Sequence, residues 1–284
     1  MSEREEIVAQ ARDRVLAHCS RPFERVRKAR LKLNRAERLL AKAARGGKAE
    51  LSVKERTVKK ARAELRDAKA RRGRRSDSQL VGWGNPTIQR VRFQILSEIG
   101  DLQGRSVLDV GSGFGDLHTF LTDQCDISIG RYLGLDITPD IISMARERHP
   151  DLEFRQEDLL LSPIGKEEFD YVFISGTLSW RWDVYTRDIL IAAFRACRVG
   201  LAVNFVFEVP TPEVVEISKG LHQEYVTPSL VLSFLHKKLS HCVVCRRDYA
   251  FADFSFYVYR DCSEYHYSRP ALALPFYYQR ESFE

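Results

Sequence analysis

From residue 82 onward, short apolar runs alternate with stretches in which hydrophobic residues recur at helical spacing. The apolar runs are typical of buried strands, and most of them end at glycine or acidic residues. Seven strands are predicted, at residues 106–110, 131–137, 152–158, 170–175, 201–207, 241–249 and 254–260. Helices are predicted at residues 139–148, 184–198 and 227–239. This order predicts an α/β fold with a doubly wound, mainly parallel seven-stranded sheet whose last two strands form an antiparallel pair.

A different pattern precedes the strands, because apolar residues there recur at alternating spacings of three and four. The first series comprises Val26, Ala29, Leu33, Ala36, Leu40 and Ala43. The second series follows Gly46-Gly47 and comprises Leu51, Val58, Ala61, Leu65 and Ala68. Heptad spacing interrupted by paired glycines predicts two helices of similar length in an antiparallel, coiled-coil-like hairpin. The predicted domains are this hairpin at residues 1–75, the α/β domain at 76–262, and an aromatic, proline-containing tail at 263–284.

Charge separates the same two parts of the chain. Residues 21–75 hold 22 Lys and Arg against six Asp and Glu, whereas residues 76–284 are net acidic. Clustered positive charge is suited to the phosphate backbone of a nucleic acid. It is equally typical of a solvated helical face on a dimerisation or docking element. Phe23 is the only aromatic residue between residues 21 and 75, which disfavours binding of single strands by base stacking.

Several classes of protein and site are disfavoured. No run of about 20 apolar residues is present, and the charged N-terminus does not resemble a secretory signal, so a protein of the cytoplasm without a membrane span is expected. Among the six cysteines, only Cys242 and Cys245 form a C-x-x-C pair, and the residues between them are typical of a strand. Because no second pair lies nearby, we expect free, at least half-buried thiols there and no metal site.

A glycine-rich loop follows the first predicted strand and precedes a helix. The sequence Asp109-Val110-Gly111-Ser112-Gly113-Phe114-Gly115-Asp116 allows close approach of the backbone to a ligand. A dinucleotide fingerprint needs a third glycine where Asp116 stands, and carboxylates would repel a pyrophosphate. Acidic residues around the loop favour a ligand that carries an ammonium and a sulfonium.

Further carboxylates follow the next two strands. Asp136 ends the second strand about 20 residues past the loop, the place of an acid that binds ribose hydroxyls. Asp158 ends the third strand, where it could accept the amine of an adenine. Each could instead be a helix-capping or turn residue. Because the carboxyl ends of parallel strands form the ligand crevice, the three acids together favour a nucleoside site.

With these motifs, residues from about 83 to 260 resemble class I S-adenosylmethionine-dependent methyltransferases. The family's E/D-x-G-x-G-x-G motif matches residues 109–115, its ribose acid falls on Asp136, and its adenine-side acid falls on Asp158. The family's fourth-strand motif falls on residues 169–176, and Trp83 lies in a lead-in that covers the cofactor in some bacterial members. The resemblance implies S-adenosyl-L-methionine as cofactor, bound by Asp109, Gly111, Ser112, Gly113, Phe114, Gly115, Asp116, Asp136, Ile137, Asp158, Leu159, Ser175, Gly176 and Trp83.

The acceptor is less defined than the cofactor. The DPPY-type signature of amino-methylating nucleic-acid enzymes is absent after the fourth strand, where the sequence is Ser175-Gly176-Thr177-Leu178. A small molecule or saccharide is slightly favoured as acceptor, and the alternatives are RNA held by residues 21–75 or a cofactor-binding adaptor without turnover. An NAD-type dehydrogenase is a further, disfavoured alternative. Asp183, His222 and Tyr225 lie near strand ends, but none is assigned as a catalytic base.

Overall fold

The computed structural model describes residues 3–43, 48–73, 86–178, 181–206, 224–249 and 253–265. By its contacts the chain divides into two compact units, Asp13–Asn85 and Met1–Arg12 together with Pro86–Glu284. The domain boundary predicted near residue 76 lies outside the described residues, as does most of the predicted tail at 263–284. Both boundaries therefore stay predictions.

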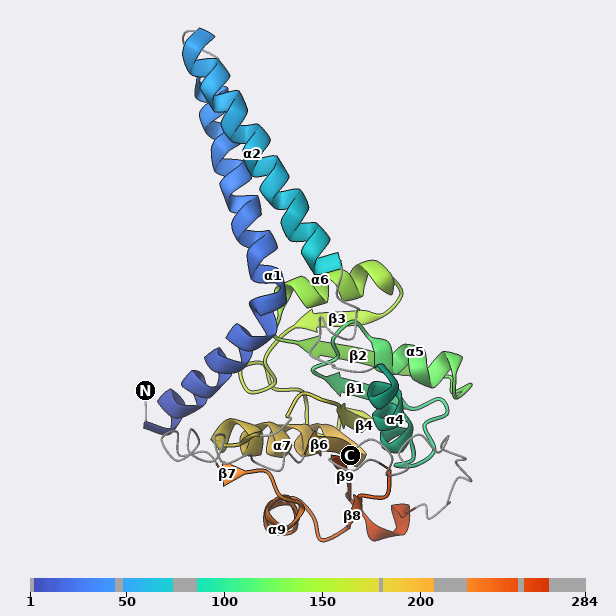
Figure 1. Cartoon of the computed structure of the whole chain (residues 1–284). Helices are drawn as coiled ribbons and strands as arrows, with labels where there is room; N and C mark the ends of the chain where they lie inside the picture. Colours follow the sequence, from blue (N-terminus) through green and yellow to red (C-terminus); the bar gives the residue numbers. More distant parts are fainter. Residues whose placement is uncertain are drawn as a thin grey trace, which may run out of the picture. The chain divides into compact units, whose positions relative to one another are not determined.

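Two long helices form the basic hairpin. Helix α1 spans Glu3–Ala43 and helix α2 spans Lys48–Gly73, and the two run side by side in opposite directions (Figure 1). Their facing alanine, leucine and valine side chains form one apolar cluster: Ala29, Leu33, Ala36, Val58, Ala61, Leu65 and Ala68, with Val26 and Leu40 partly buried against it. Ion pairs across the helices join Lys32 to Glu64 at 3.0 Å and Arg62 to Glu37 at 3.1 Å. The predicted hairpin and its apolar seam are confirmed.

The prediction of two helices of similar length is wrong. Helix α1 has 41 residues and helix α2 has 26. The heptad series begins only at Val26, so it gave no indication of the preceding helical turns. Residues 3–14 are rich in Glu, Ala, Arg and Gln, which are strong helix formers without a heptad seam.

The second unit is built on the predicted seven-stranded sheet, in the order β3-β2-β1-β4-β6-β9-β8. The strands are β1 Ser106–Val110, β2 Arg131–Asp136, β3 Glu153–Gln156, β4 Phe169–Ile174, β6 Cys197–Val206, β8 Val243–Arg246 and β9 Asp253–Tyr259. Strands β3, β2, β1, β4 and β6 are parallel, and β9 runs antiparallel to both β6 and β8. Every residue of the central strand β4 is buried, and so is every residue of β9, which lies next to the edge strand β8. The predicted α/β topology with an antiparallel last pair is confirmed.

Helices cover both faces of this sheet, with α4 and α5 on one side and α7 on the other (Figure 1). The helices are α4 Pro86–Ser97, α5 Asp116–Asp123, α6 Pro139–Arg148, α7 Val184–Ala196 and α9 Pro228–Lys238. Helix α6 has the predicted bounds, with Pro139 in its first turn. The prediction that the helix after residue 184 reaches Arg198 is wrong. Cys197 is extended and pairs with Phe169 of β4. The helix therefore ends at Ala196 and strand β6 begins at Cys197.

A short antiparallel pair lies outside the main sheet and was not predicted. It consists of β5 Arg181–Trp182 and β7 Glu224–Tyr225. Two residues per strand are too few to produce an alternating pattern in a sequence. Among the described helices, none is long and apolar enough to cross a membrane.

The cysteine prediction is wrong at both residues of the C-x-x-C pair. Cys242 forms a disulfide with Cys262, whereas Cys245 is a free, exposed thiol. Cys262 lies in the 3-10 turn η1 Cys262–Glu264 that follows β9. Because β8 and β9 pair in opposite directions, the end of β9 lies beside the start of β8. The Cα atoms of Cys242 and Cys262 are therefore 5.0 Å apart. Cys242 immediately precedes β8, where its carbonyl still accepts a hydrogen bond from the amide of Tyr259, and Cys245 lies within the strand three residues later, on the opposite face.

Candidate functional site

The glycine loop connects the end of β1 to the start of α5 in a left-handed backbone conformation. Gly111, Gly113 and Gly115 have φ of 76°, 57° and 85°, values that other residues rarely adopt. The amides of Gly111 and Ser112 donate hydrogen bonds to the carbonyl of Leu135, at 2.7 and 2.8 Å, which holds the loop against the end of β2. The loop therefore lies at the carboxyl-end edge of the parallel strands, as predicted.

The side chain of a neighbouring residue also requires glycine at position 111. A Cβ atom at this position would collide with the Thr177 side chain, whose Cγ2 would lie 2.7 Å away. Thr177 in turn donates a hydrogen bond to the carbonyl of Val110 at 3.2 Å. The glycine loop and the loop after β4 are thus packed directly against each other.

Two carboxylates lie beneath the loop, one buried (Asp109) and one half-buried (Asp136). Asp109 is 2% exposed and accepts a hydrogen bond from the hydroxyl of Tyr132 at 2.7 Å. Asp136 accepts a hydrogen bond from the amide of Thr138 at 2.8 Å and a second from the amide of Gly113. Strands β1 and β2 are neighbours in register, so both acids meet at one edge of the sheet.

Burial raises the pKa of both carboxyl groups. The pKa of Asp109 rises to about 7, first through loss of solvation and then through the charges of Asp136 and Asp116, although the Tyr132 hydroxyl opposes the rise. The pKa of Asp136 rises to about 6, again through burial, against the hydrogen bonds from Thr138 and Gly113. Ionised carboxylates are therefore costly here, and a cation bound between them would stabilise both.

Asp116 occupies the first turn of α5, next to the loop. Its carboxylate accepts a hydrogen bond from the side-chain amide of Gln89 on α4, at 3.1 Å. Asp158 follows β3 and is also engaged, because its carboxylate accepts from the amide of Leu160 at 2.9 Å and from the hydroxyl of Tyr185 at 3.2 Å. Asp158 is thus both a turn residue and a carboxylate at the ligand edge.

The apolar residues of the predicted site differ in exposure. Ile137 is half-buried next to Asp136, and Leu159 is buried next to Asp158. Phe114 is completely buried, with the guanidinium of Arg148 4.1 Å above its ring. The Phe114 side chain therefore supports the loop from the core side. Trp83 lies outside the described residues.

Two serine hydroxyls at this edge are buried without a hydrogen-bond partner among the described residues: Ser112 in the glycine loop and Ser175 after β4. The adjacent Gly176, with φ of 69°, donates its amide to the side chain of Asn204 on β6 at 2.8 Å. A buried hydroxyl without a partner is unfavourable, and a bound polar ligand would supply the missing partner.

Sequence reasoning did not identify three residues that shape this site: Tyr132, Tyr185 and Asn204. Asn204 alone left a signal, because it is a single amide within the apolar run of residues 201–207 and is completely buried. Of the polar residues named near strand ends, Asp183 caps the N-terminus of α7 by accepting from the amide of Thr186. His222 and the Tyr225 side chain lie outside the described part of the chain.

Parts of this chain are similar in sequence to known proteins. Residues 107–200 match the family model described as a methyltransferase domain. A demethylmenaquinone methyltransferase of Lactococcus lactis subsp. lactis (strain IL1403) is 31% identical over 114 residues, which cover 38% of this chain and 44% of that protein. The match thus spans less than half the length of that relative.

Solved structures are similar over a larger part of the chain at low identity. A magnesium protoporphyrin IX methyltransferase from Synechocystis PCC 6803, with bound SAH, is 15% identical with a TM-score of 0.47, covering 62% of this chain and 84% of that one. A SAM-dependent methyltransferase from Aquifex aeolicus is 17% identical with a TM-score of 0.45, covering 65% and 98%.

Proposed function

Because this chain carries a class I S-adenosylmethionine-dependent methyltransferase domain, we propose that it binds S-adenosyl-L-methionine at the glycine loop and methylates a small-molecule acceptor. The observation that carries this proposal is the pair of carboxylates formed by buried Asp109 and half-buried Asp136, whose pKa values are raised to about 7 and about 6. A cationic ligand would stabilise both charges, whereas the pyrophosphate of NAD would be repelled by them.

We assign roles from the placement of each group. Asp109 and the glycine loop hold the positively charged methionine part of the cofactor. Asp136 accepts hydrogen bonds from the hydroxyls of its ribose. Asp158 lies at the end of β3, where an adenine amine could share the carboxylate with Tyr185. The hydroxyls of Ser112 and Ser175, which have no hydrogen-bond partner in the described part of the chain, complete the set of polar groups facing the ligand.

When bound, the cofactor supplies a methyl group on a sulfonium sulfur, which passes to a nucleophilic atom of the acceptor while the electron pair of the broken bond stays on sulfur. The protein contributes orientation and exclusion of water, which can account for much of the rate of an in-line displacement. No side chain is assigned as a base, because a good nucleophile needs none.

Labelled methyl transfer to fractions of a cell extract tests the proposal. Label should appear in the small-molecule fraction and persist after nuclease and protease treatment. The Gly111→Ala variant is the matched control, because its loop is blocked by Thr177. Binding of the cofactor without transfer to any fraction would favour the non-catalytic adaptor. Calorimetry against NAD provides the second comparison, and binding of NAD alone would refute the methyltransferase proposal.

RNA is the second candidate acceptor, because residues 21–75 carry 22 basic side chains against six acidic ones. On this alternative the hairpin contacts phosphates, and label would appear in a nuclease-sensitive fraction. RNA binding should then weaken steeply as salt rises, since neutralised phosphates release counterions. A flat salt response would exclude this role and leave dimerisation or docking as the use of the hairpin.

A further inference from the structure

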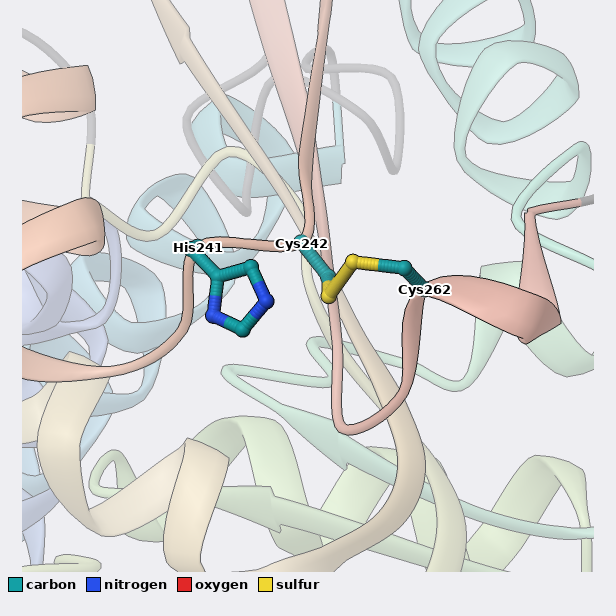
Figure 2. Close-up of side chains that lie close together, drawn as sticks. All are labelled: His241, Cys242 and Cys262. Carbon is teal, nitrogen blue, oxygen red and sulfur yellow. A yellow bond between two sulfur atoms is a disulfide. The ribbon is translucent and has the colours of Figure 1, made fainter.

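A cluster of metal-ligand side chains lies on the edge of the sheet opposite the glycine loop. The imidazole of His241 and the sulfur atoms of Cys242 and Cys262 all lie within 4.8 Å of one another (Figure 2). His241 and Cys242 precede β8, and Cys262 follows β9. Because Tyr259 near this point pairs with Gly200 at the start of β6, the cluster lies at the amino-end edge of the parallel strands, opposite the glycine loop.

We propose that these three residues form a redox-dependent Zn²⁺ site. In the oxidised protein, the two sulfur atoms form a disulfide and are not available as thiolates. A dithiol reductant transfers two electrons to the disulfide, which yields two thiols and the oxidised reductant. Zn²⁺ then displaces both thiol protons and binds two thiolates and the neutral imidazole, with water in the fourth position.

The backbone around the cluster is held by hydrogen bonds that do not depend on the disulfide. The amide of Tyr259 donates to the carbonyl of Cys242 at 2.9 Å, and the amide of Cys242 donates to the hydroxyl of Ser240 at 3.0 Å. On the other side, Asp261 accepts from both the amide and the hydroxyl of Ser263, at 2.9 Å each. The cysteines therefore stay close together after reduction, and the ligands need little rearrangement to receive a metal.

The exposure of the three ligands fits an exchangeable metal. Cys242 is buried, Cys262 is half-buried and His241 is exposed, so one side of the cluster faces solvent. Two thiolates neutralise the charge of Zn²⁺, and sulfur with imidazole is a ligand set that zinc prefers. Metal binding and disulfide formation exclude each other, because both use the same pair of sulfur atoms.

Zinc titration of reduced and oxidised protein, with a competing chelating dye, tests the site. The full-length protein is reduced with a dithiol, desalted without oxygen and compared with its oxidised form. Reduced wild type should bind one more zinc ion per chain than either the oxidised protein or the reduced Cys262→Ser variant. His241→Ala keeps the disulfide and should weaken zinc binding at least tenfold. His236→Ala on α9 and Cys245→Ser on β8 alter exposed residues outside the cluster and should stay within twofold of wild type.

A second readout does not depend on whether Cys262→Ser folds. Zinc should slow the return of the Cys242–Cys262 disulfide under mild oxidant at least tenfold in wild type, as measured by mass spectrometry of the linked peptides, and much less in His241→Ala. Equal zinc binding by oxidised and reduced wild type would overturn the proposal, as would unchanged affinity in His241→Ala. Neither outcome would affect the proposed methyl transfer, which uses the opposite edge of the sheet.

Discussion

At the scale of single residues, Asp109 determines how the proposed cofactor site responds to pH. Its pKa is raised to about 7 in the unliganded protein, mainly by burial, so it is largely protonated below that pH. A cation bound beside it lowers this pKa and releases a proton. The affinity for S-adenosylmethionine should therefore rise with pH, by up to about tenfold per unit, and level off above pH 7.

Calorimetry at several pH values checks this prediction. Asp109→Asn should weaken binding about tenfold at pH 8 and much less at pH 5, where the wild-type carboxyl is also neutral. Tyr132→Phe removes the hydrogen bond that lowers the pKa of Asp109, and so should move the rise in affinity to higher pH. An affinity that is independent of pH in the wild type would contradict the role given to Asp109.

Two glycines with similar backbone angles give a second prediction. Gly111→Ala places a methyl group against Thr177, whereas the same change at Gly104, with φ of 67°, meets no atom of the described residues within 4 Å. Gly104→Ala should cost only the backbone strain, about 1 kcal/mol of unfolding free energy. Gly111→Ala should cost at least about 2 kcal/mol more and abolish cofactor binding, as measured by denaturant unfolding and calorimetry. Similar losses of unfolding free energy in the two variants would show that the Thr177 side chain moves aside to accommodate the methyl group.

The residues that a sequence can identify are those whose partners are local. The glycine loop, Asp109 and Asp136 were predicted because strand, turn and helix signals surround them. The partner of Asp109, Tyr132, is 23 residues away, and the partner of Cys242 is 20 residues away. Side-chain pairs formed by strand register leave no local pattern, and for that reason the prediction of a free thiol at Cys242 was wrong, whereas Cys245 is free as predicted but exposed.

At the scale of elements, helix α4 is attached to β9 by a buried ion pair. Arg92 donates two hydrogen bonds to the carboxylate of Asp253, at 2.5 and 2.8 Å, and both side chains are nearly inaccessible. Asp253→Asn should lower the unfolding free energy by about 3 kcal/mol, because the guanidinium stays buried opposite a neutral amide. Glu153→Gln, which weakens an exposed pair with Arg155, should cost less than about 1 kcal/mol. Equal costs in denaturant unfolding would refute this distinction.

Element bounds were predicted best where a breaker residue or a charged residue marks the end. Helix α6 begins at Pro139, and β1 ends before Gly111, both as predicted. The end of α7 was not marked, because the apolar positions of the helix continue without interruption into β6. Pairing of Cys197 with β4 decided that boundary, and such tertiary contacts are not visible in periodicity.

At the scale of the whole molecule, the hairpin and the proposed cofactor site should be separable. Deletion of residues 1–75 should leave the affinity for S-adenosylmethionine within about twofold, because every carboxylate assigned to the cofactor follows residue 100. Calorimetry on the shortened chain measures this directly. The deletion also removes Arg12, whose charge acts on Tyr185, the partner of Asp158.

Arg12→Ala in the full-length chain is therefore the matched variant. If affinity falls in both proteins, loss of Arg12 explains the effect. A large loss in the deletion alone would mean that the hairpin contributes to the site and that the predicted boundary near residue 76 is wrong.

The position of β9 has a consequence for how the protein is made. It is the last strand in the described chain, yet it lies between β6 and β8 and pairs with both. During synthesis, the outer edge of β6 stays without its partner until residue 259 has left the ribosome. An open strand edge is a template for pairing with other chains. The nascent protein is therefore exposed to aggregation at the β6 edge until β9 has emerged, and a ribosome that stalls after β8 would release a chain that lacks the strand joining β6 to β8.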